Sequence, residues 1–277
     1  KIQDSKCQIV YVSTPDYEGG LEAGYAKAVE AVIGIVEYGM WNANNPPLSP
    51  LNLRGDERGV TEIRNPRSVI NVLVGSHLTP ADFTELREMI ESFGLKPIIL
   101  PDLSALDGSR QGMAALSLGG TKIDEIKEMS KLRDTDMLME TLSMLSGKPV
   151  PQKYERQRRI LIDGMRDAHF YYGNKKLCVA LERDLSVQTS RWLDEMGAEV
   201  FELNVNENGL FSIEGEFDLL ISNSHAEDTA KRLGVHLYQM GFPVYKVLGN
   251  NHRITIGYRG TLTLVNEIAN LLSEVHK

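Results

Sequence analysis

The sequence predicts an α/β protein with multiple Rossmann-like domains built on parallel sheets. Short apolar runs rich in β-branched residues alternate along the chain with stretches that repeat apolar residues at helical spacing. The runs at 69–74 and 177–181 are apolar almost throughout, as expected of strands buried on both faces. Gly, Asn and Pro stand between the elements and mark their ends.

The most regular stretch is one βαβ unit. A strand is predicted at 69–74, and Thr79 and Pro80 then supply a helix N-cap and a first helical residue. Apolar residues fall on one face of the helix that follows, and Gly94 ends it. The next strand is predicted at 96–100, so this unit alone specifies two parallel strands and their connection.

Two turns of this kind carry a histidine. Ser76 and His77 follow the strand at 69–74, and His225 follows a strand predicted at 217–223. Open α/β sheets bind ligands beyond the carboxyl ends of their strands, which makes both turns candidates for a crevice. Capping of the next helix explains each turn equally well without any ligand.

The remaining elements continue the alternation. Further strands are predicted at 8–13, 176–181, 199–204, 235–237 and 244–247, and helices at 21–38, 122–131, 134–146, 153–172, 184–196, 226–233 and 261–275. Residues 40–67 are rich in Asn and Pro and read as an extended connection. A domain boundary is predicted in the helix at 153–172, because it separates two βα series.

Composition excludes several classes of protein. A net charge of −8 over 277 residues argues against general nucleic-acid binding, and the basic run at 153–159 is interpreted as a solvated helix face. No apolar run approaches the roughly 20 residues that span a bilayer, and the first residues lack the pattern of a signal peptide.

The two cysteines, Cys7 and Cys178, each sit in an apolar strand run and are interpreted as buried, inert thiols. They fit a reducing cytoplasm and cannot by themselves complete a four-thiolate iron–sulfur site. The sequence also lacks the glycine-rich nucleotide motifs, the GxSxG elbow and the HExxH motif. The residues alone therefore define no catalytic constellation.

Several segments resemble one family. They are VSTPDYEGGLEAGYAKAVEAV (12–32), NVLVGSHLTPADFTEL (71–86), SGKPVPQKYERQRRILIDGMRDAHFYYGNKKLCVALERD (146–184), DLLISNSHAEDTAKRLGVHLYQMGFPVY (218–245) and YRGTLTLVNEIANLL (258–272). Together they resemble the nitrogenase component 1 family. Within it they are most similar to the β-type subunits of the scaffold that assembles the nitrogenase iron–molybdenum cofactor.

The resemblance implies three Rossmann-like domains around shared clefts, in a cytoplasmic protein that is a non-turnover scaffold rather than a catalyst. Such a subunit pairs with a NifE-type α subunit as an α2β2 heterotetramer, and the nitrogenase iron protein docks on the assembly. The complex holds an iron–sulfur precursor of the cofactor and passes the matured product to apo-nitrogenase. A [4Fe–4S] cluster is shared between the two subunits.

The resemblance also suggests site residues. Ser13, Thr14 and Asp16 are expected near the cluster at the partner interface. In the catalytic β subunit a serine stands where this chain has Asp16, which favours the scaffold type. A plain helix-entry carboxylate is the other reading of Asp16.

The chain departs from the family pattern at three places. The N-terminal segment with a cluster-ligating cysteine is absent, so the fold is expected to be incomplete at its N-terminus. Family residues are also missing near 131–134 and 204–210, either because ordered pieces of a longer chain are joined or because the natural protein is trimmed. The expected domains are 1–67 (remnant of the first domain plus linker), 68–152 (second domain, incomplete) and 153–277 (third domain).

Two alternatives stay open. The first is the β subunit of a nitrogenase-type reductase, such as the nitrogenase MoFe protein or a protochlorophyllide reductase-like enzyme. The second is a nucleotide-sugar or small-ligand enzyme, which rests only on analogy of fold.

Overall fold

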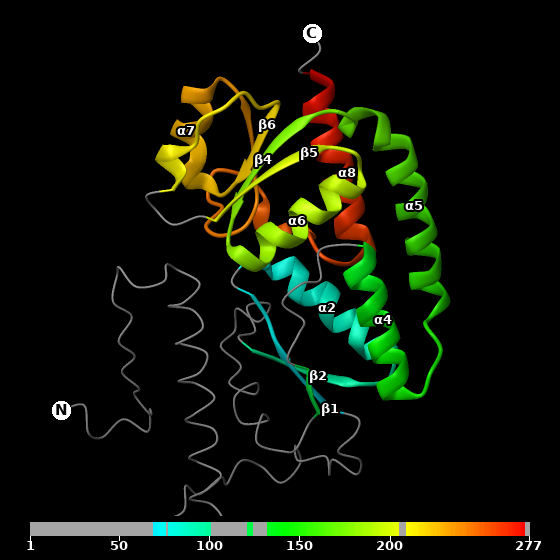
Figure 1. Ribbon diagram of the computed structural model, residues 1–277. Coiled ribbons are helices and arrows are strands. Elements are labelled where there is room, and N and C mark those ends of the chain that lie inside the picture. The colour runs from blue at the N-terminus through cyan, green and yellow to red at the C-terminus, as the bar shows by residue number, and fades with distance from the viewer. Residues whose placement is uncertain (1–68, 76, 101–120, 124–131, 205–208, 275–277) are drawn as a thin grey trace, which may run out of the picture.

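The computed structural model describes residues 69–75, 77–100, 121–123, 132–204 and 209–274 (Figure 1). The strand predicted at 8–13, the helix at 21–38 and the connection at 40–67 lie outside these ranges. So do the predicted site residues Ser13, Thr14 and Asp16.

The first sheet is parallel, with strand order β2-β1-β3. Its strands are β1 (Val69–Leu73), β2 (Lys96–Leu100) and β3 (Thr121–Ile123). The first two confirm the predicted strands. The helix predicted to begin at 122 is wrong at its start, because Thr121 and Ile123 are β-branched and pair with Ile70 and Val72 of β1.

Helix α2 (Pro80–Ser92) connects β1 to β2. It begins as predicted, with Thr79 as N-cap and Pro80 at the first helical position. Its apolar face is fully buried, and Gly94 follows the helix at a positive φ of 75°, a conformation that glycine adopts without strain. The N-cap, the first-turn proline and the terminal glycine of this unit therefore predict its helix correctly.

The second sheet is also parallel, with strand order β5-β4-β6-β7. Its strands are β4 (Lys176–Leu181), β5 (Glu199–Asn204), β6 (Leu219–Ser222) and β7 (His236–Gln239). The strand predicted at 244–247 is wrong. Residues 244–247 are not in a strand, and the Tyr245 backbone N–H donates to the Ser224 hydroxyl (3.0 Å) and not to a strand.

The other helices are α4 (Leu132–Ser146), α5 (Gln152–Tyr172), α6 (Arg183–Glu195), α7 (Glu227–Leu233) and α8 (Gly257–Glu274), with short 3₁₀ turns at Leu210–Ser212, Ser224–Ala226 and Asn250–His252. Figure 1 shows α5 running alongside α8, with α4 and α2 next to them. No helix in these described ranges is long and apolar enough to cross a membrane.

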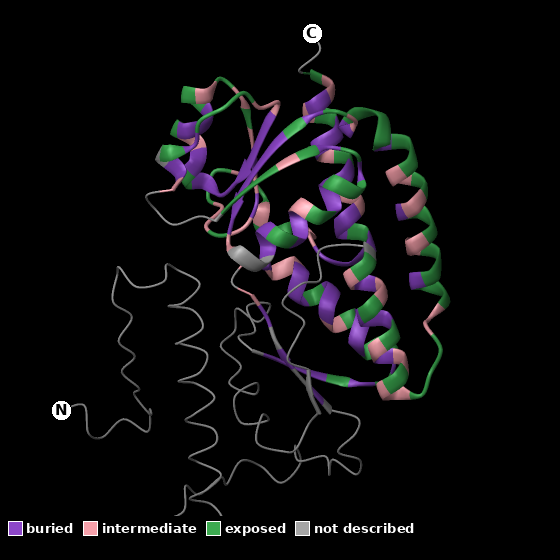
Figure 2. Ribbon diagram, viewed as in Figure 1, coloured by how far each residue is buried: buried purple, intermediate pink, exposed green. Residues whose placement is uncertain are grey.

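Helix α5 buries a narrow stripe. Its buried residues are Tyr154, Leu161, Ala168 and Tyr172, and most of its remaining length is exposed (Figure 2). The Tyr172 hydroxyl donates to the Val265 carbonyl of α8 at 2.7 Å. The basic run at 153–159 lies mainly on the exposed side, which confirms its interpretation as a solvated face.

One hydrophobic core runs through both sheets. It includes Val72 and Phe83 of the first unit together with Leu177, Ile221 and Val265 of the second. The strands of the first sheet precede α5 in the sequence and those of the second follow it. The helices of both parts nevertheless pack into a single buried cluster. The core therefore connects the two sheets.

Candidate functional site

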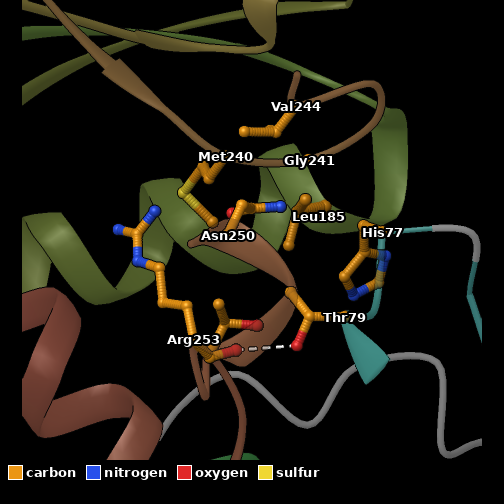
Figure 3. A pocket seen from close by; sticks show the side chains of 9 residues that line it. His77, Thr79, Leu185, Met240, Gly241, Val244, Asn250 and Arg253 are labelled. Atoms are coloured by element: carbon orange, nitrogen blue, oxygen red, sulfur yellow. Dashed lines mark hydrogen bonds between the residues drawn. The ribbon is translucent and has the colours of Figure 1, made fainter. Parts of the chain in front are cut away.

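The loop after β1 and the loop after β7 meet across a cleft between the two sheets (Figure 3). A cavity of about 20 Å³ lies between them. Its wall comprises His77, Thr79, Leu185, Met240, Gly241, Val244, Asn250, Arg253 and Thr255. Such a volume holds about one water molecule, whereas small-ligand pockets usually enclose about 300–1,000 Å³. Side chains therefore close this cleft.

His77 stands where the sequence placed a strand-end crevice, and it lines the cavity (Figure 3). Its imidazole folds over Gly75 so closely that a Cβ there would lie 2.7 Å from the ring Cε1 atom. None of the nine lining residues carries a carboxylate. In this geometry His77 is part of the wall.

Thr79 and Asp82 form a capping box at the start of α2. The Asp82 N–H donates to the Thr79 hydroxyl (3.1 Å), and the Thr79 N–H donates back to the Asp82 carboxylate (2.9 Å). The Thr79 hydroxyl also donates to the Arg253 carbonyl at 2.7 Å, across the cleft. The sequence analysis identifies Thr79 as the N-cap but does not identify Asp82, although the Thr-x-x-acid spacing is typical of a capping box.

Asp82 also binds the segment that leads into α8. Its carboxylate accepts from the Thr255 N–H (2.6 Å), the Thr255 hydroxyl (2.7 Å) and the Ile256 N–H (3.2 Å). The side chain is fully buried. Burial raises the pKa of the Asp82 carboxyl above its ordinary value, while the hydrogen bonds from Thr255 and Thr79 oppose that rise. This carboxylate lies at the amino ends of two helices, where the helix dipoles favour negative charge.

A second polar cluster is centred on Arg253, which lines the same cavity. Its guanidinium donates to the Tyr238 hydroxyl, to the Glu267 carboxylate and to the Gln239 carbonyl (3.3 Å). The Tyr238 hydroxyl donates to Glu267 at 2.6 Å, and burial raises the pKa of Tyr238 well above its ordinary value. This cluster separates the closed cleft from an open groove of about 580 Å³ beside β7 and α8.

His225, the other strand-end histidine, lies elsewhere. It is exposed, and its backbone N–H donates to the side-chain oxygen of Asn223 at 3.0 Å. Its ring centroid lies 5.9 Å from that of Tyr245. His225 is not among the residues that line the cavity with His77. The structure thus gives the two histidines separate surroundings, and capping accounts for the turn at 223–226.

The described ranges do not fit an iron–sulfur cluster. Cys178 is a free thiol buried in β4, and burial raises its pKa to about 11, as expected of an inert cysteine. No three His, Cys, Asp or Glu residues of these ranges come together as metal ligands. The residues expected near a cluster, Ser13, Thr14 and Asp16, lie outside the described part and are not tested by it.

Two parallel sheets whose carboxyl ends face a common cleft define an α/β protein of Rossmann-like domains. The chain belongs to the nitrogenase component 1 type oxidoreductase family, whose model matches residues 1–133, 131–209 and 211–273. A nitrogenase structure, "Nitrogenase Cp1 at pH 6.5", shares the fold with a TM-score of 0.65 at 24% identity, over 95% of this chain and 67% of that one.

Within the family, the chain is similar to nitrogenase iron-molybdenum cofactor biosynthesis proteins NifN. It is 34% identical to that of Bradyrhizobium diazoefficiens over 98% of this chain and 66% of the relative. It is 32% identical to that of Rippkaea orientalis over 95% and 68%. The chain therefore spans about two thirds of the length of these relatives.

The family match is interrupted at two places. Its three segments meet at 131–133 and 209–211, next to the positions where the sequence lacked family residues. The alignment with the Bradyrhizobium relative runs over 326 residues, more than the 277 of this chain. The relative therefore contains internal residues that have no counterpart here.

Proposed function

We propose that this protein is the β-type subunit of the scaffold on which the nitrogenase iron–molybdenum cofactor is assembled. The observation that carries the proposal is the similarity to proteins named for that biosynthesis, at up to 34% identity over nearly the whole chain. The alternative, a β subunit of a nitrogenase-type reductase, draws on a likeness that concerns the fold alone.

The closed cleft supports a scaffold that does not hold its cargo between these two sheets. About 20 Å³ is left there, the Thr255 hydroxyl donates to Asp82, and the Thr79 hydroxyl donates to the Arg253 carbonyl. We infer that the iron–sulfur precursor is held mainly by the NifE-type α subunit of an α2β2 heterotetramer. The same proposal includes a cytoplasmic location, docking of the nitrogenase iron protein and the domain division 1–67, 68–152 and 153–277.

A [4Fe–4S] cluster shared with the partner belongs to the proposal too. Ser13, Thr14 and Asp16 would lie beside it, since they end a predicted strand within a segment that resembles the scaffold type. Oxygen and backbone groups at such a position can set the polarity around a cluster. By the resemblance, its thiolate ligands would include a cysteine of this subunit that is not among the residues of the given sequence.

The full-length protein co-expressed with its α-type partner gives the decisive experiment. We expect a stable complex that contains iron and activates cofactor-free nitrogenase in extracts. Catalytic reduction of a substrate with the iron protein and a reductant would establish the reductase instead. A protein that purifies alone, without iron, would contradict both readings.

The Asp16→Ser variant tests the cluster-proximal residues, because serine is what the catalytic type carries there. We expect the complex to assemble, with a changed electron paramagnetic resonance signal or midpoint potential of the shared cluster. Glu91→Gln, a change on the exposed face of α2, is the control and should leave both quantities unaltered. An unchanged cluster in Asp16→Ser would remove this residue from the site.

A further inference from the structure

One buried carboxylate joins the two sheets at the cleft. Asp82 binds Thr79 in its own helix and Thr255 and Ile256, which are 173 and 174 residues away in the sequence. Its two oxygens accept three backbone N–H groups and one hydroxyl, so removing the carboxylate leaves several buried donors without an acceptor. Few side chains in the described ranges connect such distant segments through so many hydrogen bonds.

Three ion pairs also join these two parts of the chain. Glu85 pairs with Arg259, Glu88 with Lys153 (3.1 Å), and Asp136 with Arg158 (2.8 Å). In each pair the carboxylate belongs to residues 69–152 and the cation to residues 153–274. The pairs of Glu88 and Asp136 are partly exposed, so they add less than the fully buried Asp82.

The apolar core contains the inward faces of α2, α5 and α8. It extends to the cleft, where Leu78, Leu185, Met240 and Ile256 belong to it. Apolar packing and polar contacts therefore both hold the cleft closed. The polar contacts that join its two sides are the hydrogen bonds of Asp82 and the bond from Thr79 to Arg253.

We propose that Asp82 is an interdomain lock. Its carboxylate holds the first turn of α2 against the segment that enters α8, and so keeps the loops of His77 and Arg253 together. The cleft opens only when this carboxylate releases Thr255 and Ile256. Strands β4 and β6 stay packed in that opened state, so the lock controls a local motion and not the fold as a whole.

Hydrogen–deuterium exchange of the full-length protein, purified with its partner subunits, tests this inference. In Asp82→Asn an amide group faces N–H donors that the carboxylate accepted. We expect the amides of Thr79, Thr255 and Ile256 to exchange at least about tenfold faster than in the natural protein. Amides of β4 and β6 should keep their protection, and Glu91→Gln on the same helix should change none of these rates.

A milder variant keeps the test valid where Asp82→Asn fails to fold. Thr255→Val removes the hydroxyl and leaves the Thr255 N–H in place, so we expect a smaller acceleration at the same amides, about threefold. Thr255→Ser keeps the hydroxyl and should match the natural protein. The lock is overturned by unchanged exchange at 79, 255 and 256. It is also overturned by equal acceleration in β4 and β6, because Asp82 would then support only global stability.

Discussion

The two strand-end turns that look alike in the sequence differ in what packs against them. GSHLTP after β1 and SNSH after β6 each place a histidine between a strand and a helix. The first turn is covered by the loop at 253–256, and its capping box bonds across 173 residues. The second turn is covered by the loop at 242–245, through the bonds of Asn223 to Phe242 and of Ser224 to Tyr245, and only its His225 is exposed. Capping within the turn is thus common to both. The turns differ in their remote bonds, because Asp82 accepts three hydrogen bonds from Thr255 and Ile256 whereas the Asn223 amide donates one to Phe242.

The largest effect is expected at Asp82. Asp82→Ala leaves the N–H groups of Thr79, Thr255 and Ile256 without their acceptor in a buried place. We expect the free energy of unfolding to fall by about 3 kcal/mol or more. Urea denaturation followed by tryptophan fluorescence would measure it. A loss below that of Asn223→Ala would reverse the comparison between the two turns.

The pH dependence of this effect has a defined sign. The pKa of Asp82 is raised in the folded protein, so the folded state keeps a proton that the unfolded chain has already released. The stability that Asp82 contributes is therefore greatest at low pH and decreases as pH rises from the ordinary value of 3.8 through the folded pKa. Urea denaturation of the natural protein and of Asp82→Asn across this pH range should show that the difference between their free energies of unfolding becomes smaller as pH rises. A difference that grows with pH would contradict the expected sign.

A smaller loss is expected at the second turn. Asn223→Ala removes the cap of the turn at 224–226 and the bond from the Asn223 amide to the Phe242 carbonyl (3.0 Å). We expect a decrease of about 1 kcal/mol in the free energy of unfolding, the usual magnitude for a lost cap. The same denaturation measurement applies. Asn223→Ser retains a capping oxygen and should recover part of the loss.

The smallest effect is expected for His225→Ala. The ring is exposed and contacts Tyr245 at the surface, so stability should change by no more than about 0.5 kcal/mol. Thermal melting of the variant beside the natural protein would show whether the two transitions coincide. A large shift would mean that the His225 ring is covered in the full assembly.

Much of the fold could be predicted because its signals are local. The strands at 96–100, 176–181 and 199–204 are continuous β-forming runs with clear ends, and the structure has the same bounds. Helix α8 begins at Gly257, four residues before the predicted start. Its first turn contains Gly257 and Gly260, and glycine has a low helix propensity, so the sequence does not indicate a helix there. The strand expected at 244–247 failed for a nonlocal reason, since Ser224 binds that backbone.

The candidate site was predictable only in part. The position of His77 and the cap at Thr79 followed from the strand–turn–helix order, and both were correct. The partners of Asp82 and of Arg253 could not be predicted from the sequence. They lie in other segments, which come close only when the helices pack. One chain without its three-dimensional contacts does not reveal which polar residue will be buried.

The spacing of the buried stripe on α5 has a consequence for how this helix can change. Tyr154, Leu161 and Ala168 recur at seven-residue intervals and point to one side of the helix, while most of its other positions face outward. Substitutions at those outward positions can accumulate with little penalty. Insertion of a single residue, in contrast, would turn everything beyond it by about 100° and bring charged side chains against α8. The length of α5 is therefore constrained far more strictly than its composition.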